Sequence, residues 1–189
     1  ALETDLQNAL GDQKIDILLL HPGKQETPIH RIAKKNRGRA MNDDLTALAD
    51  DNRYKALKTL DLVAASLNDF QPYDTDTRYT PKALEPYDAL ADRFVRAVEC
   101  ALRYFRSHEL AEFAEQSDTT RTLLNRMEKL GLVSHADVWL AMRNIRNRIV
   151  HDYLPEQTAQ MFAEISGIYG GELLNLRAKL LSASSKSRA

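Results

Sequence analysis

The stretch from Asp137 to Tyr153 constrains this chain most, because it combines helical periodicity with an arginine on the apolar side. At about 100° per residue, a helical wheel centred on Arg146 places four apolar side chains within roughly 60° of it. These are Trp139, Met142, Ile149 and Val150. A guanidinium in an apolar face needs a partner, since a buried unpaired charge costs on the order of several kcal/mol and arginine keeps its proton.

Two interpretations of Arg146 stay open at the level of sequence. The arginine either extends its charged end to solvent or to a carboxylate, or it lines a cleft where this face meets a second copy of the chain. In a two-fold dimer the same surface of both copies would meet, so both Arg146 side chains would approach one axis. The second interpretation predicts a homodimer.

A row of polar side chains borders this apolar face. Arg143, Asn147 and His151 follow one another at intervals of four residues, so they share one line along the helix. Packing does not explain a row of guanidinium, amide and imidazole. Chemistry does, because arginine binds phosphate bidentately and imidazole exchanges protons near neutral pH. The row therefore predicts a phosphate-directed site.

The segment Arg-Asn-Arg-Ile-Val-His-Asp-Tyr at positions 146–153 resembles the R-N-x-x-x-H-x-Y signature of HEPN domains. Trp139 and Met142 also stand where the HepT-like toxins of that family usually have them. The resemblance covers roughly residues 42–181. It implies a helical bundle that dimerises so that two such motifs face one composite site, and a metal-independent endoribonuclease that needs no cofactor. It also implies a partner, a minimal nucleotidyltransferase antitoxin that attaches AMP to the motif tyrosine.

Carried onto this chain, the resemblance assigns a role to each motif residue. Arg146, His151 and Asn147 become the catalytic group, and Tyr153 becomes the regulatory AMP acceptor. Two further residues become RNA-binding or structural cations: Arg143 and Arg148. In HEPN folds a polar group from a neighbouring helix can approach the motif, which makes Glu99 a weak candidate, because a surface ion pair between Arg96 and Glu99 explains that residue better.

Composition sets the wider limits. The chain has 189 residues, of which 43% are hydrophobic and 28% charged, as in ordinary soluble globular proteins. A single cysteine, Cys100, excludes an internal disulfide and favours a cytoplasmic location. We expect no membrane association, because no apolar run has the length of a bilayer-spanning helix. The net charge of −1 hides a mildly basic second half, which suits a phosphate-bearing partner.

Residues 1–41 differ from the rest, with an apolar β-type run at 14–20 followed by a short helix from Thr27 to Lys35. This β-α appendage resembles the C-terminal part of a minimal nucleotidyltransferase, in which Asp16 would be one metal-binding carboxylate. The glycine-serine turn and the paired aspartates that should precede it are absent, so we expect no nucleotide transfer by this chain alone. An unrelated β-α appendage fits the same residues.

From residue 42 onward the periodicity predicts a mainly α, up-and-down bundle of about five helices. The expected helices span about residues 42–70, 80–113, 118–130, 134–154 and 156–181, and a frayed tail follows at 182–189. Asn42 and Thr80 are expected N-caps, Gly131 a C-cap, and Ser134 with Asp137 a capping box. The predicted core includes Leu90, Phe94, Val98, Ala101, Leu102, Phe105, Met161, Phe162, Ile165, Ile168, Leu173, Leu176 and Leu180.

These expectations combine into one function and one alternative. The first is a metal-independent endoribonuclease toxin that acts as a homodimer on RNA and is controlled by a nucleotidyltransferase. The alternative is a non-catalytic HEPN module that docks a nucleotidyltransferase or a nucleotide, with Tyr153 as acceptor. Cleavage of RNA in the presence of EDTA distinguishes the two.

Overall fold

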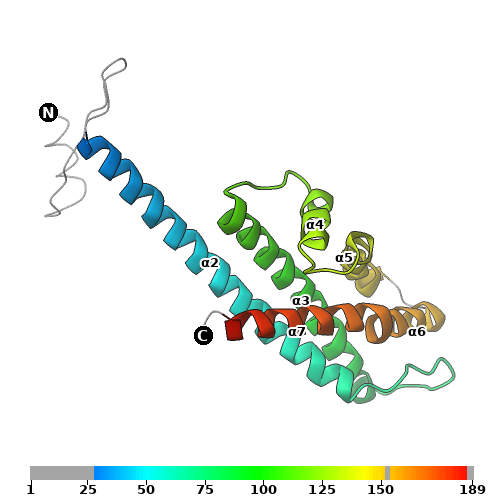
Figure 1. Cartoon of the computed structure of the whole chain (residues 1–189). Helices are drawn as coiled ribbons and strands as arrows, with labels where there is room; N and C mark the ends of the chain where they lie inside the picture. Colours follow the sequence, from blue (N-terminus) through cyan, green and yellow to red (C-terminus); the bar gives the residue numbers. More distant parts are fainter. Residues whose placement is uncertain (1–27, 152–153, 187–189) are drawn as a thin grey trace, which may run out of the picture. The chain divides into compact units, whose positions relative to one another are not determined.

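A computed structural model describes residues 28–151 and 154–186, with side chains described for 42–145, 148–149 and 154–183. Every regular element in these residues is helical, which confirms the predicted mainly α class (Figure 1). The predicted strand at 14–20 and Asp16 lie outside the described residues. Within the described part, no helix combines the length and the apolar character needed to cross a bilayer.

The elements follow in the order α2 (Pro28–Asn68), α3 (Pro81–Phe113), α4 (Thr120–Lys129), α5 (Ala136–His151), α6 (Pro155–Glu164), the π-helical turn η1 (Ile165–Tyr169) and α7 (Gly170–Lys186). The chain divides into two compact units, residues 1–44 and 45–189. The first unit is helical from Pro28 on. The packing described for the helices belongs to the second unit.

Helix α2 corrects the prediction of two separate helices at its position. It begins at Pro28 as expected, but it continues without interruption to Asn68, so Asn42 lies inside a helix and is not an N-cap. Residues 36–41 contain no proline, and the single glycine at 38 costs a helix only about 1 kcal/mol. The local signals for a break are therefore too weak to end the helix.

Helix α3 follows its prediction closely. The Thr80 side chain accepts a hydrogen bond from the Ala83 amide, and Pro81 occupies the first position, where the missing N–H costs nothing. The predicted apolar stripe, from Leu90 to Phe105, is buried throughout. The second long helix of the sequence is thus a central core element.

The last predicted helix is interrupted by η1, in which the backbone turns more widely than in an α-helix. The predicted core residues on either side, from Met161 to Leu180, are buried. Ile168 is the exception, because the wider turn rotates it into solvent, where 65% of its surface is exposed. Helix α7 then continues to Lys186, past the end predicted at Leu181.

Gly170 lies where η1 meets α2. A Cβ atom at this position would stand 2.7 Å from the carbonyl oxygen of Ile165 and 2.9 Å from Leu67 Cδ1. Real Cβ atoms do not approach a backbone oxygen this closely. The backbone of the π turn therefore requires glycine at 170, whereas a Cβ at Gly171 would meet nothing within 4 Å.

We expect Gly170→Ala to lower the free energy of unfolding by about 1–3 kcal/mol, because the added methyl overpacks a rigid contact. Gly171→Ala is the matched control and should raise stability by up to about 1 kcal/mol through helix propensity alone. Urea unfolding followed by circular dichroism measures both. Equal stability of the two variants would contradict the close approach.

Candidate functional site

The predicted site lies on α5, whose backbone is helical from Ala136 through His151. Positions 143, 146, 147 and 151 are therefore all helical, as the wheel assumed. The side chains of Arg146, Asn147 and His151 lie outside the described residues, as does all of Tyr153. The structure is informative about the helix that carries them and about the contacts that hold this helix.

One face of α5 is buried, and it is the predicted one. Trp139 and Met142 are fully enclosed, Ile149 is half-buried, and Ile145, which the sequence analysis did not single out, is buried as well. The buried stripe is wide because α3 and α4 both pack against α5. Helical register continues this stripe through position 146, while Arg143 on its border is exposed.

Helices α3 and α5 run antiparallel. The Phe105 ring meets the Trp139 ring with centroids 5.1 Å apart, while farther back along α3 Phe94 lies 6.1 Å from Tyr169, which is close to Arg148. The half-buried Glu99 lies on α3 between these two anchors. Its place along α3 thus corresponds to a position on α5 between Trp139 and Arg148, beside the start of the motif segment.

The predicted Arg96–Glu99 ion pair is wrong. The Arg96 guanidinium pairs instead with Asp92, four residues earlier on α3. A spacing of four residues in a helix is as favourable for an ion pair as a spacing of three, so sequence could not separate the two partners. The ion pair with Arg96, which was the structural explanation for Glu99, is therefore not formed.

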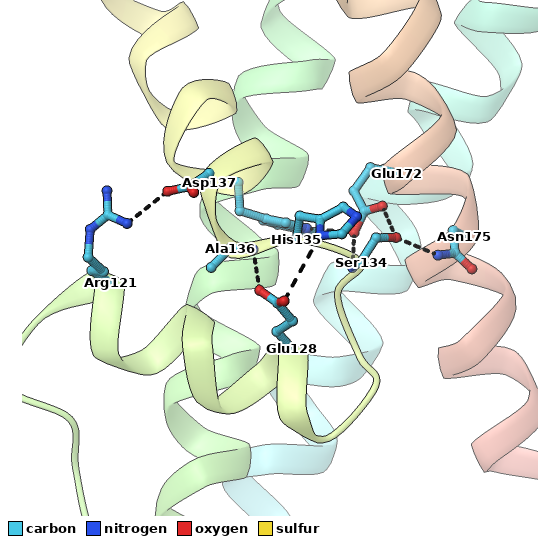
Figure 2. A network of polar contacts seen from close by, with 9 residues as sticks. Arg121, Glu128, Ser134, His135, Ala136, Asp137, Glu172 and Asn175 are labelled. Atoms are coloured by element: carbon cyan, nitrogen blue, oxygen red, sulfur yellow. Dashed lines mark hydrogen bonds and ion pairs between the residues drawn. The ribbon is translucent and has the colours of Figure 1, made fainter.

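A buried carboxylate from α7 holds the start of α5. Glu172 accepts hydrogen bonds from the Ser134 amide at 2.7 Å, the Ser134 hydroxyl at 2.5 Å and Trp139 Nε1 at 2.9 Å (Figure 2). Burial by itself would raise the pKa of the Glu172 carboxyl, but these hydrogen bonds and the charge of Lys179 hold its pKa below the usual value. The carboxylate is thus stabilised in its charged form.

A second carboxylate, from α4, caps the same helix end. Glu128 Oε2 accepts a hydrogen bond from the Ala136 amide at 2.7 Å, and Asp137 forms an ion pair with Arg121 at 2.7 Å (Figure 2). The predicted capping box of Ser134 and Asp137 is therefore wrong, because both side chains bind elsewhere. Charged groups from other helices satisfy the first amides better than a neutral local hydroxyl.

The C-terminal half of α5 is held by α6. Arg148 Nη1 lies 2.6 Å from Glu164 Oε2, and both side chains are about a third exposed or less. Gln160 donates a further hydrogen bond to the other oxygen of Glu164, at 2.9 Å. Arg148, one of the two predicted RNA-binding cations, thus has a structural partner.

Arg143, the other predicted cation, lies in solvent beside the start of α4. Its Nη1 is 3.5 Å from Thr120 Oγ1, a distance at which a hydrogen bond is weak. Among the described side chains, Thr120 is its one hydrogen-bond partner, and a guanidinium has five donors. Of the two arginines, Arg143 is the one whose described contacts leave it ready to bind an anion.

The residues that sequence reasoning missed are three carboxylates that fix the motif helix from outside. They are Glu128 on α4, Glu164 on α6 and Glu172 on α7. Along the chain they lie 8, 16 and 38 residues from Ala136, Arg148 and Ser134, the residues that they bind. Periodicity carries no signal for such pairs, and only the last of them is buried.

No family model matches this chain, and a search of curated proteins finds no match either. The residues of α5 and the contacts around this helix are therefore what indicates a function.

We expect Glu172→Ala to lower the free energy of unfolding by about 2 kcal/mol, because it leaves the buried Trp139 indole N–H without an acceptor. Asp137→Ala is the control, since its exposed ion pair contributes at most about 1 kcal/mol. Chemical unfolding of both variants at neutral pH measures the difference.

The Glu172 effect has a defined pH dependence. A carboxyl whose pKa is lower in the folded state stabilises the protein above its unfolded pKa of about 4.3, and this stabilisation is lost as pH falls through the folded value. The gap in stability between the native protein and Glu172→Ala should therefore narrow below about pH 4. A gap that widens with acid would contradict the hydrogen-bonded carboxylate.

Proposed function

We propose that this chain is a metal-independent endoribonuclease of the HEPN type, acting as a homodimer and forming the toxin half of a pair with a nucleotidyltransferase. The observation that carries the proposal is the motif at positions 146–153, whose first six positions lie on the helix α5. Further support is the buried stripe through Trp139 and Met142, which continues in register to position 146.

The chemistry proposed is transesterification within RNA. The ribose 2′-oxygen bonds to phosphorus, its proton passes to an imidazole, and the bond from phosphorus to the 5′-oxygen breaks as that oxygen gains a proton. His151 of one copy takes the first proton and His151 of the other supplies the second. Arg146 stabilises the charge that develops on the phosphorane, and Asn147 orients the substrate.

This mechanism explains why two copies are needed. One α5 supplies one imidazole, whereas the reaction requires a base and an acid on opposite sides of phosphorus. A two-fold axis beside position 146 brings both into one cleft, and RNA phosphate there offsets the repulsion between the two guanidinium groups. The 2′-hydroxyl is the nucleophile, so RNA is cut in EDTA and DNA is not.

We expect His151→Ala and Arg146→Ala each to slow RNA cleavage by about a hundred- to ten-thousandfold, because each removes proton transfer or charge stabilisation. The matched controls are His135→Ala, at an exposed histidine near the start of α5, and Arg96→Ala, at an exposed arginine on α3. Gel analysis of RNA in EDTA follows cleavage, and circular dichroism confirms folding.

The controls should cleave at the native rate. Full activity of folded His151→Ala would remove the mechanism. A native protein that is dimeric, folded and inert towards varied RNAs would instead favour a module that docks a nucleotidyltransferase or nucleotide.

We expect the partner nucleotidyltransferase to inactivate the protein at Tyr153. The phenol oxygen attacks the α-phosphorus of ATP, pyrophosphate leaves, and the attached AMP adds a negative phosphate seven residues along the chain from Arg146. Mass spectrometry after incubation with this enzyme and ATP should locate one added AMP at Tyr153. Tyr153→Phe should resist modification and stay active, while Tyr54→Phe, at a tyrosine with 61% of its surface exposed, should be modified and inactivated as the native protein is.

AMP found on another residue, or equal inactivation of Tyr153→Phe, would contradict the regulatory role. Either result would leave the nuclease assignment to be judged by the cleavage assay.

A further inference from the structure

A cavity of about 550 Å³ lies between the C-terminal turns of α2, the loop that follows and the first half of α3. Its volume falls in the range of about 300–1,000 Å³ that is typical of small-molecule pockets. No role in the proposed nuclease uses it. Its walls combine aromatic rings with a cation, so they favour a ligand that has both an aromatic ring and a negative charge.

The apolar wall is a rigid set of rings. Phe70, Tyr79 and Tyr87 line the cavity, and Tyr87 meets Phe70 edge-on at 5.9 Å and Tyr79 edge-on at 5.5 Å. The Tyr87 hydroxyl donates to the Pro72 carbonyl oxygen at 3.3 Å, which fixes the ring. Burial raises the pKa of Tyr87 to about 12, so this phenol is neutral at physiological pH. The wall thus offers ring faces and edges without negative charge.

The cation is Arg93, whose half-buried side chain reaches the cavity from α3. Its Nη1 donates to Ser66 Oγ on α2 at 2.5 Å. Among the residues that the structure describes, no carboxylate lies within ion-pair distance of Arg93, although Asp69 and Glu85 also line the cavity. A guanidinium has five N–H donors, and the described residues supply an acceptor, Ser66, for one of its nitrogens.

We propose that this cavity binds a small aromatic acid, with its ring against Tyr79, Tyr87 and Phe70 and its carboxylate on Arg93. Flat rings stack or meet edge-to-face with aromatic walls, and carboxylates form the strongest hydrogen bonds with guanidinium. A half-buried arginine without an acidic partner offers the carboxylate a charge-assisted hydrogen bond.

The test uses 2-naphthoate as probe, together with its neutral amide and with cyclohexanecarboxylate, which lacks the aromatic ring. Two-dimensional amide NMR of the full chain should show saturable shifts at Ser66, Tyr87 and Arg93 with 2-naphthoate. The amide and the cyclohexane acid should each bind about tenfold more weakly, because each lacks one of the two recognised features.

Two variants localise the binding. Arg93→Gln should weaken 2-naphthoate about tenfold or more, whereas Arg96→Gln, on the same helix but paired with Asp92 outside the cavity, should bind as the native protein does. Ala65→Leu fills the cavity from the α2 side and leaves Arg93 in place. This variant should abolish binding of 2-naphthoate. Thermal unfolding of each variant confirms that it is folded.

The proposal is overturned if 2-naphthoate gives no saturable shifts up to millimolar concentration. It is also overturned if the neutral amide binds as tightly as the acid, or if folded Arg93→Gln binds as tightly as the native protein. None of these outcomes bears on RNA cleavage, so the result is independent of the nuclease assignment.

Discussion

The position of the motif helix depends on one buried carboxylate. Glu172 accepts three hydrogen bonds from the residues that begin α5, and one of its donors is the indole of the fully buried Trp139. Trp139 in turn packs on Phe105 of α3. Because the indole ring is in the core and its N–H is committed to α7, α5 has little freedom to slide or rotate. The rotation of α5 about its axis is therefore also fixed for the residues later in the helix.

The π-helical turn decides which apolar side chains of α7 face the core. A π turn holds one more residue than an α turn, so it rotates everything after it relative to α6. Ile168 is turned out to solvent by this rotation, and Leu173 is turned into the core beside the buried Glu172. Gly170 follows the turn at a point where a Cβ atom would stand 2.7 Å from the carbonyl oxygen of Ile165. The exposed isoleucine is thus the counterpart of the buried leucine that follows the turn.

Sequence predicted the parts of this structure that local rules decide. Thr80 and Pro81 start α3 with their own side chains, and the stripe from Leu90 to Phe105 is buried because its period matches a helix. The start of α5 could not be predicted, because acceptors from α4 and α7 replace the local capping box. Asn42 failed as a cap for the opposite reason, since nothing local ends the helix before it. The predicted site residues follow the same division: the helix that carries them was predictable, and the carboxylates that hold it were not.

The distribution of charge along α5 has a physical consequence for the proposed nuclease. Three carboxylates, of Glu128, Asp137 and Glu172, surround the helix start, where the positive end of the helix dipole favours them. The motif cations occupy the other half, where the negative end favours positive side chains but disfavours a bound phosphate. A phosphate site there needs more positive charge than one arginine supplies. Arg148 is paired with Glu164, so this requirement falls on Arg143 and on the residues at 146 and 151. A second copy of the same helix end would double that charge, so the proposed dimer has an electrostatic reason in addition to the catalytic one.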